Sequence, residues 1–287
     1  MSLRTITGSQ RVIHHEGVEI VPVRHWGRLI LAALVGLLLV VVVYSFATNP
    51  NIDWSIVGRF LVSPAILKGL WGTVQLTFFS MIFAVALAVV IAVMRTSSSA
   101  ILRGFAAGYV YIFRGIPLIV LLIFVGNLGL FFKDFALGVP FTDIVFFSIP
   151  TKDVMTPFVA AVVGLSLAGS GYMAEIVRAG LLSVGRGQHE AAKALGTTPA
   201  MTLRYIVLPQ ALRVLIPPMG NELIGMLKAT AIVSVIAGGD LLTIALGISG
   251  TNYRTIELLI VATVWYLLVI SVLSIVQFFV EKRSAER

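Results

Sequence analysis

Residues 189–209 of the chain read HEAAKALGTTPAMTLRYIVLP and lie between two long apolar stretches. His189 to Leu195 are strong helix formers, and Gly196 is the residue type that most often ends a helix in the left-handed conformation. Thr198 followed by Pro199 predicts an N-cap and the first residue of a second short helix, which we expect Pro209 to stop. The segment therefore predicts two short helices joined by a sharp corner.

The composition of the chain places this segment in a membrane protein. Of its 287 residues 58% are hydrophobic and 12% are charged, and the mean hydropathy is +1.00. Soluble domains contain about 45–50% apolar and about 25% charged residues. The absence of cysteine excludes disulfides, cysteine-bound metal and thiol catalysis. We therefore expect an all-α polytopic membrane protein.

The apolar runs predict six transmembrane helices, near 29–47, 69–94, 105–132, 157–181, 214–238 and 256–280. At about 1.5 Å per residue each can cross a hydrocarbon core about 30 Å thick. We expect the first run to be retained as a span, because the polar stretch before it is too long for a signal peptide.

The third run contains the sequence FRGIP, which predicts a break at Pro117 between a helix near 99–113 and another near 117–132. We place this break at the cytosolic face, where Arg114 would be an interfacial anchor. A gating or ATPase contact is the alternative role for Arg114.

The positions of the cationic residues predict the orientation of the chain. If the amino terminus is inside, fifteen of the 21 lysines and arginines lie in internal segments, five in external segments, and Lys228 within a span. Positive charge accumulates on the cytoplasmic side of membrane proteins. The internal residues are Arg4, Arg11, Arg24, Arg28, Arg95, Arg103, Arg114, Arg178, Arg186, Lys193, Arg204, Arg213, Lys282, Arg283 and Arg287. We therefore expect both termini and residues 182–213 in the cytoplasm, and no nucleic-acid partner.

The spacing within the opening segment is specific. Glu190-Ala191-Ala192, Gly196, Ile206 and Leu208-Pro209 resemble, without a gap, the EAA signature of permease subunits of bacterial ABC importers. In that family the segment forms a coupling helix that sits in a cleft of a separate cytoplasmic ATPase subunit, and the resemblance implies the same role here. A connector lying on the membrane surface is the alternative.

Three further stretches are similar to permeases for polar amino acids: YIFRGIPLIVLL (111–122), GYMAEIVRAGLLSVGRGQHEAAKALG (171–196) and LPQALRVLIPPMGNELIGMLKATAIVSVI (208–236). The resemblance covers roughly residues 66–280. The chain departs from the pattern at Ala229, where the group usually has aspartate, and at Ala231, where it usually has serine. These departures leave the transported substrate open.

The resemblance implies the type I ABC importer permease fold for the core of the chain, and the apolar runs and charges predict the parts that precede the core. Residues 1–28 would be a cytoplasmic tail, 29–48 an extra transmembrane helix, and 66–281 the core domain, with the coupling segment at 187–209. The implied function is import of a polar amino acid across the bacterial inner membrane by alternating access. The implied partners are an ATPase dimer, a second permease chain, identical or paralogous, and an extracytoplasmic solute-binding protein.

No catalytic constellation is present in the sequence. Because the chain lacks the GxxxxGK[ST] phosphate loop, we expect no enzyme activity here and ATP with Mg²⁺ on the partner. We expect no metal site, since His14 and His15 have no third ligand at metal spacing. The alternative functions are a gradient-driven secondary transporter or channel, for which we see no internal repeat, and an ABC permease for another small solute.

Charges within the spans suggest a substrate pathway, because an ionisable residue in a membrane is costly. The charged candidates are Glu175, Glu222 and Lys228, and the hydroxyl residues Thr230 and Ser234 complete the set. Counting the fifth span from Pro217 puts Lys228 about 16 Å into the membrane and Glu222 about 8 Å. A zwitterionic amino acid would find both signs of charge there. Alternatively, Glu175 pairs with Arg178 and Lys228 only ties helices together.

Residues 133–156 fall outside the resemblance and mix acids, prolines and aromatics. They would form either a docking surface for an extracytoplasmic binding protein or a short helix on the lipid headgroups.

Overall fold

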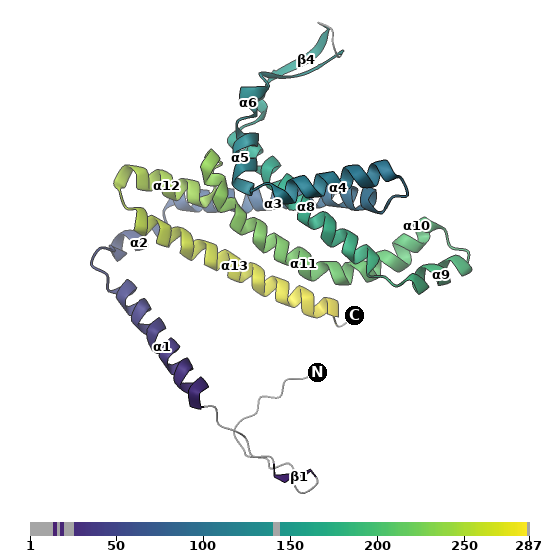
Figure 1. Ribbon diagram of the computed structural model, residues 1–287. Helices are drawn as coiled ribbons and strands as arrows, with labels where there is room; N and C mark the ends of the chain where they lie inside the picture. The colour runs from purple at the N-terminus through teal and green to yellow at the C-terminus, as the bar shows by residue number, and fades with distance from the viewer. Residues whose placement is uncertain (1–13, 16–17, 20–25, 140–143, 286–287) are drawn as a thin grey trace. The chain divides into compact units, whose positions relative to one another are not determined.

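The computed structural model describes residues 14–15, 18–19, 26–139 and 144–285 of the chain (Figure 1). The chain falls into two compact units, Met1–Ile52 and Asp53–Arg287, and each is described by itself. Four arginines used above for the charge bias, Arg4, Arg11, Arg24 and Arg287, lie outside the described residues.

The first unit contains a two-stranded hairpin and one long apolar helix. Strand β1 (His14–His15) pairs antiparallel with β2 (Val18–Glu19). Helix α1 covers Trp26–Ala47, and none of its residues is buried. Its 22 residues reach about 33 Å at about 1.5 Å per residue, enough to cross a hydrocarbon core. The structure therefore contains the helix expected at the first apolar run and begins it earlier, at Trp26.

The second unit is built mainly from helices. Its long helices are α3 (Pro64–Thr96), α4 (Ala100–Gly115), α8 (Pro157–Leu182), α11 (Leu208–Ala229), α12 (Leu241–Asn252) and α13 (Thr255–Ala285). Its shorter elements are α2 (Trp54–Leu61), α5 (Leu118–Gly126), α6 (Leu128–Phe131), α7 (Thr151–Val154), α9 (Arg186–Ala194), α10 (Pro199–Thr202), a π turn (Leu203–Val207), a 3₁₀ turn (Thr230–Ile236), and strands β3 (Asp134–Gly138) and β4 (Val145–Pro150).

The number of membrane-length helices agrees with the six predicted spans. Within the described residues five helices are long and apolar enough to cross, and the bent pair of α4 and α5 supplies a sixth if it counts as one span. The third predicted span is thus the broken one, as the FRGIP sequence indicated.

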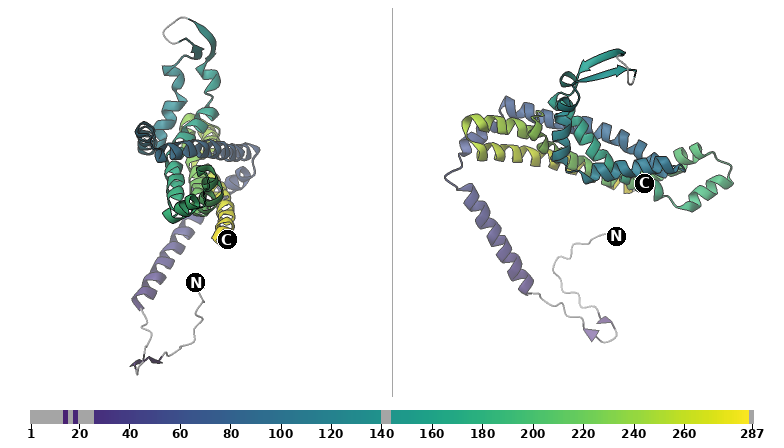
Figure 2. Two further views of the ribbon diagram at one scale, coloured as in Figure 1. Left: turned by 90° about the vertical axis from the view of Figure 1, so that its right-hand side faces the viewer. Right: turned by 45° about the horizontal axis from the view of Figure 1, so that its top comes forward.

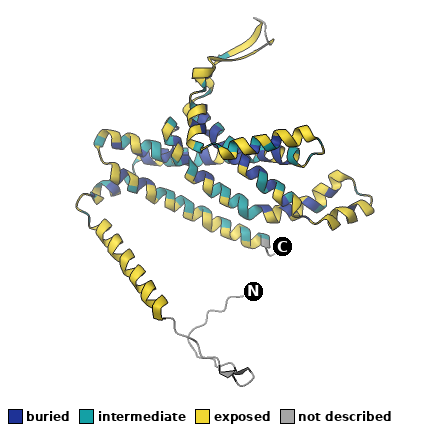
Figure 3. Ribbon diagram, in the orientation of Figure 1, coloured by how far each residue is buried: buried dark blue, intermediate teal, exposed yellow. Residues whose placement is uncertain are grey.

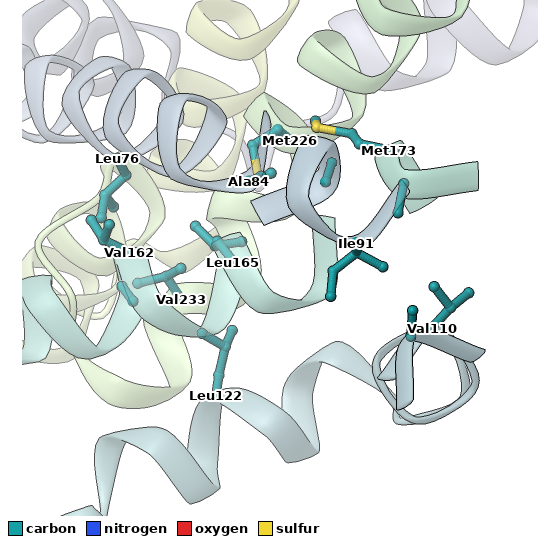
Figure 4. Close-up of a cluster of buried hydrophobic side chains, with 14 residues drawn as sticks. Leu76, Ala84, Ile91, Val110, Leu122, Val162, Leu165, Met173, Met226 and Val233 are labelled. Carbon is teal, nitrogen blue, oxygen red and sulfur yellow. The ribbon is translucent and has the colours of Figure 1, made fainter. Parts of the chain in front are cut away.

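The core of the second unit forms where α3 lies along α8. Small residues such as Ala84 and Ala88 on α3 are fully buried there. Figure 4 shows Leu122 of α5, Leu165 of α8 and Met226 of α11 directed into the same cluster. Because small side chains let helix backbones approach closely, this contact is the type that stabilises helix pairs in membranes.

The outer surface of the helices is apolar, as a lipid-facing surface must be. On α3 the side chains of Phe78, Phe83 and Val90 are exposed. Figure 3 shows that α13 is mostly exposed or partly buried, with its buried residues confined to its first turns. Exposed apolar side chains on membrane-length helices are what a surface in contact with lipid requires.

The break between α4 and α5 is confirmed at the FRGIP sequence. Helix α4 ends at Gly115 and α5 begins at Leu118, and their axes differ by 100°. Pro117 has no N–H and keeps Ile116 in an extended conformation, with φ −77° and ψ 128°. The predicted second helix, 117–132, was too long, because α5 ends at Gly126 and α6 follows it.

One prediction about proline is wrong. Pro209 does not stop a helix, and the helix that forms the fifth span also extends well before Pro217, the residue from which depth was counted. The chain is helical from Pro199 to Ile236, and both Pro217 and Pro218 lie inside α11. The π turn Leu203–Val207 widens the backbone just before Pro209. The wider turn leaves room for the proline ring and does not require a hydrogen bond from the N–H that proline lacks.

Residues 134–150 contain an element that the sequence did not predict. β3 and β4 form an antiparallel hairpin between α6 and α7, where an all-α fold was expected to have a loop or a short helix. Figures 1 and 2 show that this hairpin extends sideways, away from the bundle of α3, α8, α11 and α13.

A close backbone contact joins α3 to the start of α12. Gly239 has φ +83°, and a Cβ placed on Gly72 would lie 2.2 Å from the Gly239 carbonyl oxygen. The Thr73 hydroxyl accepts a hydrogen bond from the Leu241 N–H at 2.9 Å. Buried Asp240 caps α12 by accepting from the backbone N–H groups of the residues that follow it.

We expect Gly72→Ala to destabilise the protein by on the order of 1–3 kcal/mol, because the added methyl group meets a backbone atom that cannot rotate away. Thermal unfolding in detergent measures this effect. The matched control is Gly108→Ala on α4, where an added Cβ meets nothing within 4 Å. Equal melting temperatures for the two variants would contradict the expected clash.

Candidate functional site

The segment after α8 forms a corner held together by its own hydrogen bonds. Gly196 has φ +71°, as predicted from its place at the end of the first short helix. Thr198 is the N-cap of α10 and accepts from the Met201 N–H, with Pro199 in the first turn, also as predicted. The Thr197 hydroxyl donates to the Ala192 carbonyl at 2.9 Å. These bonds fix the angle between α9 and α10.

The corner attaches to the helical bundle by one side and is exposed on the other. On α9 only Ala192 is buried, whereas Glu190, Ala191 and Leu195 are exposed. At the far end of the corner Ile206 is half-buried, and Leu208 and Pro209 are exposed. The predicted coupling residues thus lie mostly on an open surface.

A buried cluster connects the corner to the spans. Val184 precedes α9, Val207 ends the π turn, and both pack with Ala211 and Leu215 of α11. A cavity of about 620 Å³ lies beside them, between the corner, the end of α3 at Thr96 and the end of α8 at Leu182. Movement of α9 and α10 would therefore displace the ends of α3, α8 and α11.

A second cavity, of about 260 Å³, lies at the break between α4 and α5. Its walls come from that break, from α8 and from α11; they are Phe113, Ile116, Leu118, Leu165, Ala168, Gly169, Tyr172, Glu222, Gly225, Met226 and Ala229. We call it the break cavity. Its polar groups are the hydroxyl of Tyr172 and the carboxyl of Glu222.

Arg114 lies beside this cavity. Its guanidinium carbon is 5.1 Å from the centre of the Tyr172 ring, and its charge interacts with that of Glu222. A Cβ on Gly171 would lie 3.1 Å from the Arg114 side chain, so α4 and α8 meet closely here. The sequence analysis did not predict the contact of Arg114 with Tyr172. The available signals were the helix break at FRGIP and Gly171, a small residue directly before Tyr172.

Of the five predicted pathway residues, only Glu222 lines the break cavity. Thr230 donates its hydroxyl to the Leu227 carbonyl at 2.6 Å, and Ser234 donates to the Ala231 carbonyl at 2.8 Å. Lys228 is exposed, and within the part of the chain that the structure describes it forms no ion pair. Counted from Leu208, the start of α11, Lys228 lies about 30 Å along the helix, and its depth in the membrane stays a prediction.

Glu175 forms ion pairs with Arg178 and Arg95. The pair with Arg178 is the alternative that the sequence left open. Arg178 donates to Glu175 Oε2 from Nε at 2.9 Å and from Nη2 at 2.7 Å. Arg95 Nη2 lies 3.1 Å from the other carboxylate oxygen. The carboxylate therefore ties the end of α3 to α8 and does not face the break cavity.

Comparison with known proteins identifies the family. Residues 84–286 match the model of the binding-protein-dependent transport system inner membrane components. The arginine transport system permease protein ArgU of Corynebacterium glutamicum is 40% identical over 92% of this chain and 82% of its own length. The chain belongs to this family. The L-cystine transport system permease protein TcyB of Bacillus subtilis is 34% identical over 81% of this chain and 91% of its own.

Solved structures agree with this membership. An amino acid ABC transporter solved with histidines has a chain that is 35% identical, with a TM-score of 0.68 over 81% of this chain and 99% of that one. A chain of the MetNI methionine ABC transporter is 22% identical with a TM-score of 0.61 over 76% of this chain and 95% of that one, which shows the shared fold. The type I importer permease fold predicted from the sequence is confirmed.

We expect Glu175→Gln to lower stability by on the order of 1–3 kcal/mol, because Arg95 and Arg178 would face each other without a counter-charge. Arg178→Gln should have a smaller effect, since the Arg95–Glu175 pair remains. Thermal unfolding of both variants in the same detergent compares them. An equal or larger loss in Arg178→Gln would contradict this role of Glu175.

Proposed function

We propose that this chain is the membrane-spanning permease subunit of an ATP-driven importer for a polar amino acid. The exposed α9–Gly196–α10 corner on a bundle of membrane-length helices carries the proposal. Support for the substrate class comes from relatives whose names specify arginine, L-cystine, and glutamate or aspartate. The corner has a defined conformation, because Gly196 in the left-handed region and a hydrogen bond from Thr197 maintain its angle.

In this proposal the corner transmits the closure of an ATPase pair to the spans. Glu190, Ala191, Gly196, Ile206, Leu208 and Pro209 would meet the ATPase subunit, with buried Ala192 on the attached side. ATP and Mg²⁺ would be held by that partner. Small side chains at the exposed positions let another surface approach α9 closely, and Glu190 offers a charge to a basic partner.

A second permease chain and an extracytoplasmic binding protein complete the proposed complex. Kinship with an amino acid ABC transporter and with binding-protein-dependent permeases supports these partners. The charge bias supports a multi-pass orientation in the bacterial inner membrane with both termini in the cytoplasm. The second permease would be either another copy of this chain or a paralogue.

We propose the break cavity as part of the substrate pathway. Its aromatic and carboxylate groups, together with Arg114 beside it, provide charges of both signs near an apolar wall. A free amino acid is a zwitterion, so Glu222 would meet a cationic end and Arg114 the carboxylate. Lys228, exposed and on the turn that also contributes Gly225 and Ala229 to the cavity, would meet the substrate on its way in or out.

The coupling role predicts that Gly196→Val leaves the chain in the membrane but lowers ATPase association or substrate-stimulated ATP hydrolysis. A β-branched residue at φ +71° costs on the order of 1–3 kcal/mol locally and would misalign α9 and α10. Glu190→Lys should act in the same direction and more weakly. Copurification with the ATPase and hydrolysis assays in vesicles measure both effects.

The matched control is Gly104→Val, which places the same side chain on an exposed helical glycine of α4 with nothing within 4 Å of the added Cβ. If the Gly196→Val complex hydrolyses ATP like the unmodified complex, the corner is not the coupling element.

The pathway predicts that Glu222→Gln and Lys228→Met preserve assembly with the ATPase but reduce uptake, the latter to near zero. Each substitution removes a charge that would meet the zwitterion. Uptake of labelled amino acid into proteoliposomes measures this, with Arg178→Gln, whose charge faces Glu175, expected to be milder. Normal uptake and apparent affinity in Lys228→Met would remove the lysine from the pathway, and the same result in Glu222→Gln would remove the break cavity.

A further inference from the structure

The β3–β4 hairpin has one wholly apolar face and one mixed face. In its register Phe135 lies opposite Ile149 and Leu137 lies opposite Phe147, so these four side chains share one face. Asp134, Ala136, Ser148 and Pro150 point to the other face. The apolar face is uncovered, because Leu137 is 70% exposed and Phe147 is 58% exposed. The hairpin therefore presents a surface that needs a partner.

The bend at Pro117 determines where this surface lies. Helix α4 runs beside α3, and the 100° turn sends α5 and the hairpin out from the side of the bundle (Figures 1 and 2). A partner docking on the end of the bundle would not meet a hairpin directed sideways. A surface directed sideways from the spans can meet the membrane or the second permease chain.

The backbone of the hairpin restricts its depth in that membrane. Two strands have two open edges, and unpaired N–H and C=O groups do not occur in contact with hydrocarbon. The headgroup layer hydrates such edges, and a sheet lying flat there keeps its mixed face in water. The hairpin also links the broken span to α8, whose first residue, Pro157, begins a membrane-length helix. Its base thus lies near the end of a span.

The surface next to the hairpin continues the same apolar character. Leu130, Phe131 and Phe132 are exposed between α5 and β3. A groove of about 300 Å³ beside them, lined by α5 and α6, has Asn127 as its one polar side chain. Lys133 and Lys152 are exposed at the base of the two strands, each followed by an exposed aspartate, and the strands are joined there by the bond from the Thr151 N–H to the Lys133 carbonyl at 3.0 Å. Exposed lysines at a membrane boundary match lipid phosphates.

We propose that the apolar face of the β3–β4 hairpin lies on the lipid bilayer at the level of the headgroups. The hairpin is then an in-plane anchor for α5, whose first residue, Leu118, lines the break cavity. The bilayer surface in this way helps to hold one wall of that cavity. Phe146, the extra residue at the bulge, is 71% exposed, and the register assigns it to neither face.

The absence of native cysteine allows a direct test with spin labels. Phe147→Cys and Ser148→Cys place a label at neighbouring positions on opposite faces of β4. The labelled full chain, assembled with its ATPase and reconstituted in phosphatidylethanolamine–phosphatidylglycerol vesicles, is exposed to oxygen, which enters the bilayer, and to a nickel chelate, which stays in water. We expect the ratio of oxygen to nickel collisions to be several-fold higher at Phe147→Cys.

Leu137→Cys and Ala136→Cys repeat the comparison on β3, because they lie opposite Phe147 and Ser148, and keep the test valid if one β4 variant fails to assemble. Equal ratios on the two faces would place the hairpin in water and overturn the proposal. Protection of the apolar face from both oxygen and nickel would also overturn it, in favour of a second permease chain. Protection that appears only on adding the solute-binding protein would identify that protein as the partner instead.

Discussion

Close approach of α3 and α8 depends on small side chains, and the other helices are arranged around this contact. Ala84 and Ala88 are fully buried, and the Ser166 hydroxyl bonds to the Val162 carbonyl within α8 at 2.6 Å and to the Ser80 carbonyl of α3 at 3.3 Å. Lipid offers no hydrophobic force between helices, so near contact and shared hydrogen bonds have to stabilise the pair. The glycines of α8 extend this principle to its neighbours, since Leu122 of α5 fills the space at Gly164 and Met226 of α11 that at Gly169.

The same principle makes a mechanical connection between the corner and the membrane core. Leu215 of α11 occupies the space beside Gly180 of α8, and it belongs to the buried cluster that includes Val184 and Val207 on either side of the corner. The Glu175 carboxylate adds a charged tie between α8 and α3. A push on α9 or α10 is therefore transmitted to several spans together, as near-rigid tilting of helices requires.

A single proline shapes both the proposed substrate cavity and the lateral surface of the protein. The break at Pro117 opens the wall that Phe113, Ile116 and Leu118 contribute to the cavity, and it turns α5 away from α4. The charge of Arg114, one residue before Gly115, is brought beside Tyr172 at this point. The hairpin follows α5 and α6 in the chain, so the proposed lipid contact and the proposed pathway both depend on this turn.

Local physical chemistry by itself determined the membrane class, the helix break and the corner. Apolar length, a missing N–H at Pro117 and the absence of a Cβ at Gly196 act over a few residues, so the sequence displays them directly. Pro209 misled because a π turn just before it lets the helix continue into α11. Only the tertiary structure brought Arg114, Tyr172 and Glu222 together and paired Glu175 with Arg95. These contacts join residues far apart in the chain, and their geometry follows from helix packing, which acts through space and leaves no periodic trace in the sequence.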